Sequence, residues 1–173
     1  SGRIPRSLFQ TVKRKGKPKM LNKKLIILGA ALVLGAATVK LFAHCQIPCG
    51  IYDDPTRFTL MEEHVTTIEK SMKEIDRLSA DAAKNGNQIV RWVKNKEAHA
   101  EELAGIVTYY FMAQRVKPTI PEDTGKYNKY VAQITTLHQI LFHTMKTKQT
   151  TDPSHIETLR ILIGEFKASY FAK

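Results

Sequence analysis

Apolar side chains recur at intervals of three and four residues along most of the chain after residue 56, a spacing typical of amphipathic α-helices. The first stretch places one apolar face over residues 58–78, made of Phe58, Met61, Val65, Ile68, Met72, Ile75 and Leu78. The sequence Asn-Gly-Asn at residues 85–87 then interrupts the pattern. A second stretch, from about Gln88 to Val116, carries Ile89, Val93, Ala100, Leu103, Val107 and Tyr110 on one face. The pattern therefore predicts two helices separated near residue 86.

Two more periodic stretches follow a connection that contains Pro118, Pro121 and Gly125. Residues 126–148 present Tyr127, Val131, Ile134, His138, Leu141 and Met145. The last stretch opens with Asp152 as a helix cap and Pro153 at the first helical position. Its predicted inner face consists of Ile156, Leu159, Ile163, Phe166 and Tyr170. Four amphipathic helices with short connections predict an all-α fold, an antiparallel four-helix bundle over residues 56–173.

A different pattern precedes the bundle. Residues 25–43 are apolar except for Lys40, and their length lies between that of a signal-peptide core and that of a membrane-spanning helix. This segment is therefore either a signal that is removed or a single-pass membrane anchor. Residues 1–24 are basic, and the absence of acidic residues there is typical of the remains of an organellar transit peptide. In both interpretations the basic leader stays on the side of the membrane where the protein is synthesised, and the bundle crosses to the other side.

The distribution of charge excludes one class of partner. The chain has a formal net charge of +11, but ten of its Lys and Arg residues lie within residues 1–43, where there is no Asp or Glu. The remaining residues are almost neutral, whereas a nucleic-acid-binding domain usually carries its positive charge on the folded surface. We therefore expect no nucleic-acid partner. The predicted organisation is a basic leader (1–24), a hydrophobic transmembrane or signal helix (25–43), a metal-binding segment (44–55) and the bundle (56–173).

Both cysteines of the chain lie in the segment His44-Cys45-Gln46-Ile47-Pro48-Cys49-Gly50-Ile51-Tyr52. A proline disfavours helix at the residue before it and a glycine allows a tight turn, so this segment can curl into a hook with both sulfurs inward. Two thiolates cannot complete a tetrahedral zinc site by themselves. If His44 is a chain terminus, its α-amine, the deprotonated backbone amide of Cys45 and the two sulfurs can supply a planar set of nitrogen and sulfur donors. The His44 imidazole then binds axially, an arrangement that points to nickel or copper.

This segment, at the head of a helical domain, resembles the nickel hook of the nickel superoxide dismutases. Residues 44–173 resemble that family over their whole length, including residues 90–97 on the second helix and 110–118 after it. The resemblance implies a nickel ion as cofactor and superoxide as substrate, which is disproportionated to O2 and H2O2. It assigns the metal ligands to His44, Cys45 and Cys49. It further implies that Tyr52 lines the substrate approach, with Pro48 and Gly50 shaping the hook.

The resemblance also suggests groups that orient the axial histidine. In some members of the family a Glu on the first helix and an Arg on the second hold it. Alignment places His99 at the position of that Arg, and the Glu corresponds to Glu62 or Glu63. A Glu–His pair can orient His44, with a charge that depends on pH. The alternative is that His99 is an ordinary helical histidine.

Two functions from different classes follow from the leader. The family site needs a free amine on His44, which requires cleavage after Ala43. If that bond is cut, we expect a nickel superoxide dismutase on the far side of an energy-transducing membrane. If the leader is retained, we expect an inactive, membrane-anchored structural subunit of a photosystem or respiratory complex with a vestigial metal site. The expected location is the thylakoid membrane with the bundle in the lumen; the inner mitochondrial or a bacterial membrane is the alternative. The family resemblance implies a homohexamer, and the second function implies partner subunits.

Overall fold

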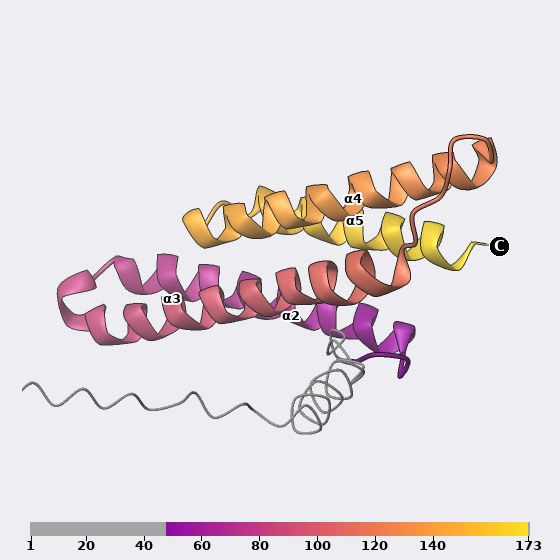
Figure 1. Ribbon diagram of the computed structural model, residues 1–173. Helices are drawn as coiled ribbons and strands as arrows, with labels where there is room; N and C mark the ends of the chain where they lie inside the picture. Colours follow the sequence, from indigo (N-terminus) through magenta and orange to yellow (C-terminus); the bar gives the residue numbers. More distant parts are fainter. Residues whose placement is uncertain (1–47, 173) are drawn as a thin grey trace, which may run out of the picture. The chain divides into compact units, whose positions relative to one another are not determined.

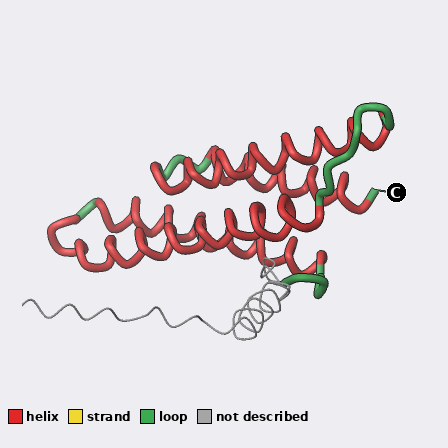
Figure 2. The backbone as a smooth tube through the Cα atoms, in the orientation of Figure 1, coloured by secondary structure: helices red, strands yellow, loops and turns green. Residues whose placement is uncertain are grey.

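Four long helices joined by short connections make up the computed structural model, which describes residues 48–172 (Figures 1 and 2). The helices are α2 (Asp54–Ser79), α3 (Ala82–Gly105), α4 (Thr124–Gln149) and α5 (Ser154–Phe171), and a π-helix, η1 (Ile106–Arg115), continues α3. Within the described range there is no strand, which confirms the predicted all-helical fold. The basic leader, the hydrophobic segment 25–43 and residues 44–47 lie outside the described residues. Of the helices that are described, none has the length and apolarity to span a membrane.

The helices form two hairpins that pack against each other. Only Ala80 and Asp81 separate α2 from α3, so these two helices run in opposite directions, as α4 and α5 also do (Figure 1). Helix α3 contacts α4 and helix α2 contacts α5. The aspartates Asp53, Asp81 and Asp123 each accept a hydrogen bond from the backbone N–H three residues later, which caps the starts of α2, α3 and α4.

The break between the first two helices was predicted at the wrong place. Helix α3 begins at Ala82 and passes through Asn85 and Gly86 without interruption. Asp81 caps the start of α3. The side-chain amide of Asn85 donates to the carbonyl of Leu78 at 3.2 Å, so this carbonyl at the end of α2 has a hydrogen-bond partner. These local hydrogen bonds outweigh the cost of a glycine in a helix interior, about 1 kcal/mol.

The start of the last helix also differs slightly from the expectation. Helix α5 begins at Ser154, one residue after the predicted start at Pro153. The Asp152 carboxylate accepts from the Ser154 N–H at 2.9 Å, so this aspartate does satisfy a backbone donor at the beginning of the helix.

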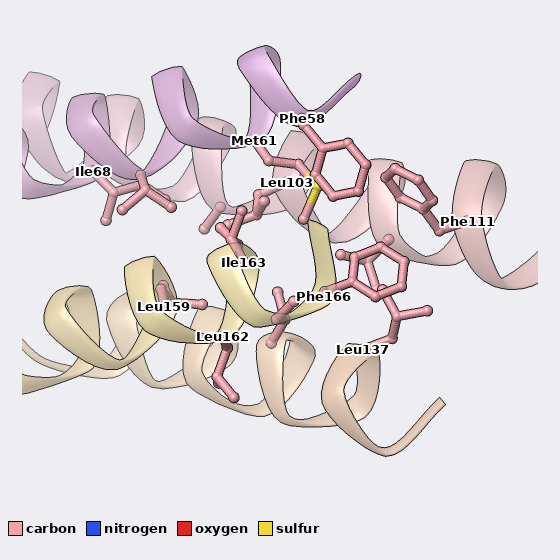
Figure 3. Packing of buried hydrophobic residues seen from close by; sticks show 14 of the residues in the cluster. Phe58, Met61, Ile68, Leu103, Phe111, Leu137, Leu159, Leu162, Ile163 and Phe166 are labelled. Atoms are coloured by element: carbon pink, nitrogen blue, oxygen red, sulfur yellow. The ribbon is translucent and has the colours of Figure 1, made fainter. Parts of the chain in front are cut away.

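The core lies between the two hairpins (Figure 3). Phe58 from α2, Phe111 from η1 and Phe166 from α5 meet at one end, and the ring centroid of Phe111 lies 4.9 Å from those of both Phe58 and Phe166. Ile68 and Leu159 extend the core along the bundle. The predicted inner faces of the first and last helices are confirmed, except that Ile75 and Tyr170 are only partly buried.

The predicted inner face of α4 is only partly correct, because Ile134 and Leu141 are half-buried against the core but other positions are exposed. Val131 and Met145 are 42% and 40% exposed, and His138 is also exposed. The residues that α4 buries are Gln133, Leu137, Ile140, Thr144 and Thr147. Three of these are polar, and the hydroxyls of the two threonines donate to carbonyls within the helix at 2.7 Å. Counting apolar positions alone therefore selected a neighbouring face. On α3, Val93 is likewise exposed rather than inward.

Candidate metal centre and its surroundings

The described chain begins inside the predicted hook. His44 and Cys45 lie outside the described residues, and Cys49 lies at the surface of the described part. Gly50 has φ of +78°, in the left-handed region that side chains disfavour. A Cβ at Gly50 would meet no atom within 4 Å, so the backbone conformation, not lack of space, makes glycine suitable. The chain thus turns sharply directly after the exposed Cys49. This agrees with a metal-binding segment that lies outside the core of the bundle.

Tyr52 connects the hook to the bundle. Its side chain is 39% exposed, and its hydroxyl donates to Oε1 of Gln114 at 3.4 Å. Its ring meets the ring of Tyr110 edge-on at a centroid distance of 5.8 Å. The guanidinium carbon of Arg115 lies 4.4 Å from the Tyr52 ring centroid, a cation–π contact. The ring is therefore held by side chains of the bundle, and its hydroxyl lies near the surface.

All the side chains that hold Tyr52 come from the π-helix η1. The i→i+5 hydrogen bonding of a π-helix brings residues five apart onto one face, as Tyr110 and Arg115 are here. The N–H of Val116 donates to the carbonyl of Phe111 at 2.8 Å, which closes the last wide turn. Such turns occur often at functional sites, and this one places an aromatic ring and a cation beside Tyr52.

Beneath Tyr52, the carboxylate of Asp54 joins three parts of the bundle. Arg115 donates from Nε to Oδ1 at 2.9 Å and from Nη2 to Oδ2 at 2.6 Å, a bidentate pair. The hydroxyl of Tyr110 donates to Oδ1 at 2.5 Å, and that of Tyr170 donates to Oδ2 at 2.9 Å. The start of α2 is thereby fastened to η1 and to the end of α5.

The ionisation states in this network follow from its burial. Burial raises the pKa of Asp54, but the hydrogen bonds from Arg115, Tyr110 and Tyr170 outweigh it and hold the pKa below its ordinary value. Burial, with the hydrogen bond to Asp54, raises the pKa of both Tyr110 and Tyr170 to about 12. The hydrogen bonds to Asp54 raise the pKa of Arg115 despite its burial. At neutral pH the network is thus an ion pair with two neutral phenols.

A second polar cluster lies where α2 and α3 face each other. Nδ1 of His64 is 2.9 Å from Nδ1 of His99, and Nε2 of His64 is 3.5 Å from Oε2 of Glu102. Burial lowers the pKa of His64, and the effect of Glu102, which raises it, is smaller. His64 and Glu102 line an open groove of about 500 Å³, and Pro48 and Tyr110 line the same groove. The cluster therefore lies beside the described end of the hook.

The two glutamates suggested as partners of the axial histidine are both exposed. Glu62 forms an ion pair with Nζ of Lys167 on α5 at 3.2 Å. The charge of Glu63 offsets a small part of the lowering of the His64 pKa, which is caused mainly by burial. His99 contacts His64. Whether any of these groups orients His44 stays a prediction, because His44 is not among the described residues.

Sequence reasoning missed His64, Glu102 and the Asp54 network. The spacing of three between His99 and Glu102, which places both on one helix face, is a signal for the first group. His64 could have been added only by knowing how α2 and α3 align, since it lies 35 residues from His99. Tyr110 and Tyr170 lie 56 and 116 residues from Asp54.

Comparison with known protein families gives one match. The family described as nickel-containing superoxide dismutase matches residues 39–173, which include the whole hook and all four helices. No curated protein and no solved structure matches the chain.

Proposed function

Because the chain belongs to the nickel-containing superoxide dismutase family, its cofactor is a nickel ion, and we propose that it disproportionates superoxide at the segment 44–52. Two superoxide anions and two protons give one O2 and one H2O2. The observation that carries the proposal is that the family match includes the segment holding both cysteines of the chain. When bound, nickel supplies a one-electron couple that accepts an electron from one superoxide and returns it to another.

The residues of the segment fit nickel. His44, Cys45 and Cys49 would hold it, because thiolate and nitrogen donors in one short segment suit this metal. Cys49 lies at the surface beside a sharp turn rather than in the core. A sulfur in this position can ligate a metal without disturbing the packing of the bundle.

The neighbouring side chains support binding of a small anion. Tyr52 presents its hydroxyl near the surface beside the hook, where it can donate a hydrogen bond to an oxygen anion when it leaves Gln114. Arg57 lies in the groove that Pro48 lines, and its guanidinium carbon is 5.0 Å from the ring centroid of Tyr110. Its Nε is buried and has no hydrogen-bond partner within the described part of the chain. We propose that this positive charge attracts superoxide to the hook.

The test compares two chain lengths and two cysteine variants. A chain that begins at His44 should bind one nickel ion and dismute superoxide, whereas the 173-residue chain should lack the amine ligand and activity. Cys45→Ser and Cys49→Ser in the shorter chain should each abolish nickel binding and activity, because a hydroxyl is a poor donor to nickel. Equal activity in both chain lengths would show that the amine is unnecessary. A folded but inactive shorter chain that binds no nickel would refute the enzymatic proposal.

We propose that residues 25–43 carry the bundle across an energy-transducing membrane, with the thylakoid lumen as its location. The positive charge of residues 1–24 supports this orientation. Protease added on the lumenal side of isolated thylakoids should digest the bundle and spare the leader. Protection of the bundle with loss of the leader would reverse the orientation. Detection of the protein in mitochondrial or bacterial membranes alone would exclude the thylakoid.

The second candidate function is that of a structural subunit in a photosynthetic or respiratory complex. It is favoured by the 43 residues that precede His44 in this sequence. If they are retained, the nitrogen of His44 is a peptide amide. The N-terminal residue of the protein isolated from its native membrane decides between the two functions. Co-purification of the uncleaved chain with a membrane complex would favour the subunit, and a homohexamer that begins at His44 would favour the enzyme.

A further inference from the structure

Three potential metal ligands meet on α2 and α3, outside the hook. His64, His99 and Glu102 each offer one ligand atom, and these atoms lie within 4.8 Å of one another. No other group of three or more such side chains occurs among residues 48–172. None of the three is among the nickel ligands that the family resemblance assigns to the hook.

The two imidazoles are already spaced for a shared ion. Their Nδ1 atoms are 2.9 Å apart. Two nitrogens that each bind one ion at about 2.0–2.1 Å lie roughly 2.9–3.4 Å apart, depending on the bond angle. A single proton now has to serve both nitrogens, since two donors cannot face each other. The ring centroids are 5.2 Å apart, so the two lone pairs point at each other along one line. A cation can bind both nitrogens in place of that proton when the rings tilt and both lone pairs turn toward an ion beside that line.

The third ligand can reach the same ion. Oε2 of Glu102 lies 3.5 Å from Nε2 of His64, and the Glu102 side chain is 63% exposed. It can therefore rotate toward the two nitrogens at little cost in packing. His99 and Glu102 lie three residues apart on one face of α3, opposite His64 on α2. A cation would thus cross-link helices α2 and α3, whose connection is only two residues long.

The surroundings favour an ion with an open coordination position. His64 is only 8% exposed, so its nitrogens are largely shielded from water. On its open side, the cluster adjoins the groove of about 500 Å³ that Pro48 also lines. Two imidazoles and one carboxylate form a donor set typical of zinc with a fourth position left for water.

We propose that His64, His99 and Glu102 form a second metal site, separate from the nickel hook, that binds a borderline divalent cation such as Zn²⁺. The site joins α2 to α3 and opens into the groove beside Pro48. Bound metal stabilises the hairpin because it binds the folded arrangement and not the separated helices.

The experiment uses the full 173-residue chain with both Cys45→Ser and Cys49→Ser, purified in detergent. Zinc binding is measured by competition with a chromophoric chelator. This background removes the thiolates, so the result does not depend on whether the hook binds nickel. We expect one zinc ion per chain and a higher melting temperature with zinc. Absence of zinc binding to the folded variant would overturn the proposal.

Ligand variants then locate the ion. Glu102→Gln keeps the size of an exposed side chain, and His99→Gln leaves the buried His64 in place. Each should weaken zinc binding at least about tenfold, the order expected when support of a metal site is lost. The matched control is His143→Gln, because Nδ1 of His143 lies 3.1 Å from Nδ1 of His155 in a similar histidine pair. An equal loss in the control, or full affinity in both ligand variants, would overturn the assignment.

Cobalt gives an independent readout. Co²⁺ in place of zinc should give visible d–d bands without the strong near-ultraviolet absorption of thiolate ligation. Glu102→Gln should change the intensity of these bands, and His143→Gln should not. Identical spectra in the Glu102→Gln variant and its parent would exclude the carboxylate as a ligand.

Discussion

Replacement of Asp54 by Asn tests how strongly its carboxylate fastens the start of α2 to η1 and to the end of α5. The side chain of Asp54 is only 15% exposed, and its two oxygens accept from Arg115, Tyr110 and Tyr170. An asparagine keeps the shape but loses the charge, and its amide NH2, itself a donor, faces hydrogen-bond donors. Hydrogen bonds to charged groups contribute about 1.5–3 kcal/mol each, and unpairing a partly buried cation adds to the loss. We expect the free energy of unfolding to fall by about 2–4 kcal/mol.

The neighbouring residue provides the matched control. Asp53 accepts from the N–H of Thr56 at 3.1 Å, and it is an exposed helix cap. Asparagine caps helices about as well as aspartate, so Asp53→Asn should change stability by no more than about 0.5 kcal/mol. Urea denaturation followed by circular dichroism measures both variants.

The pH dependence gives the sign of the effect. The pKa of Asp54 is lower in the folded than in the unfolded protein. Its contribution to stability is therefore complete at pH values above the unfolded-state pKa, and it is lost as the pH falls through the folded-state pKa. The parent should therefore lose stability below about pH 4 more steeply than Asp54→Asn does. Equal stability of the two asparagine variants would refute the reasoning. So would an equal loss of unfolding free energy per pH unit below about pH 4 in the parent and in Asp54→Asn.

Three further perturbations test other parts of the molecule. Tyr52→Phe removes the hydroxyl and leaves the ring, so kcat/KM for superoxide should fall while the nickel content, measured by elemental analysis, is retained; loss of nickel would give Tyr52 a structural role. Ile68→Asp buries a charge at a position that is 0% exposed and should cost several kcal/mol, whereas Ile161→Asp, at a 61% exposed position, should not; equal melting temperatures would contradict the assigned core. Gly50→Ala forces a side chain into the left-handed region at a cost of about 1–2 kcal/mol, and it should weaken nickel binding in a chelator competition without changing the melting temperature of the bundle.

Residues close together in sequence determined the helical fold class and led to the proposed set of nickel donors. The 3.6-residue period of a helix is local, so the repeated apolar positions of α2 and α5 identified their inner faces correctly. Both cysteines and the candidate histidine lie within six consecutive residues, so their joint chemistry could be recognised without knowing the fold.

Tertiary structure alone decided which face of α4 is buried and which distant side chains meet. The polar residues Thr144 and Gln133 are buried because their hydrogen bonds are satisfied within α4 and by α5, which no count of apolar positions can reveal. The partners of Asp54 and the pairing of His64 with His99 depend on how helices align across the bundle. That alignment is set by packing along whole helices, and therefore it cannot be derived from any short segment of the chain.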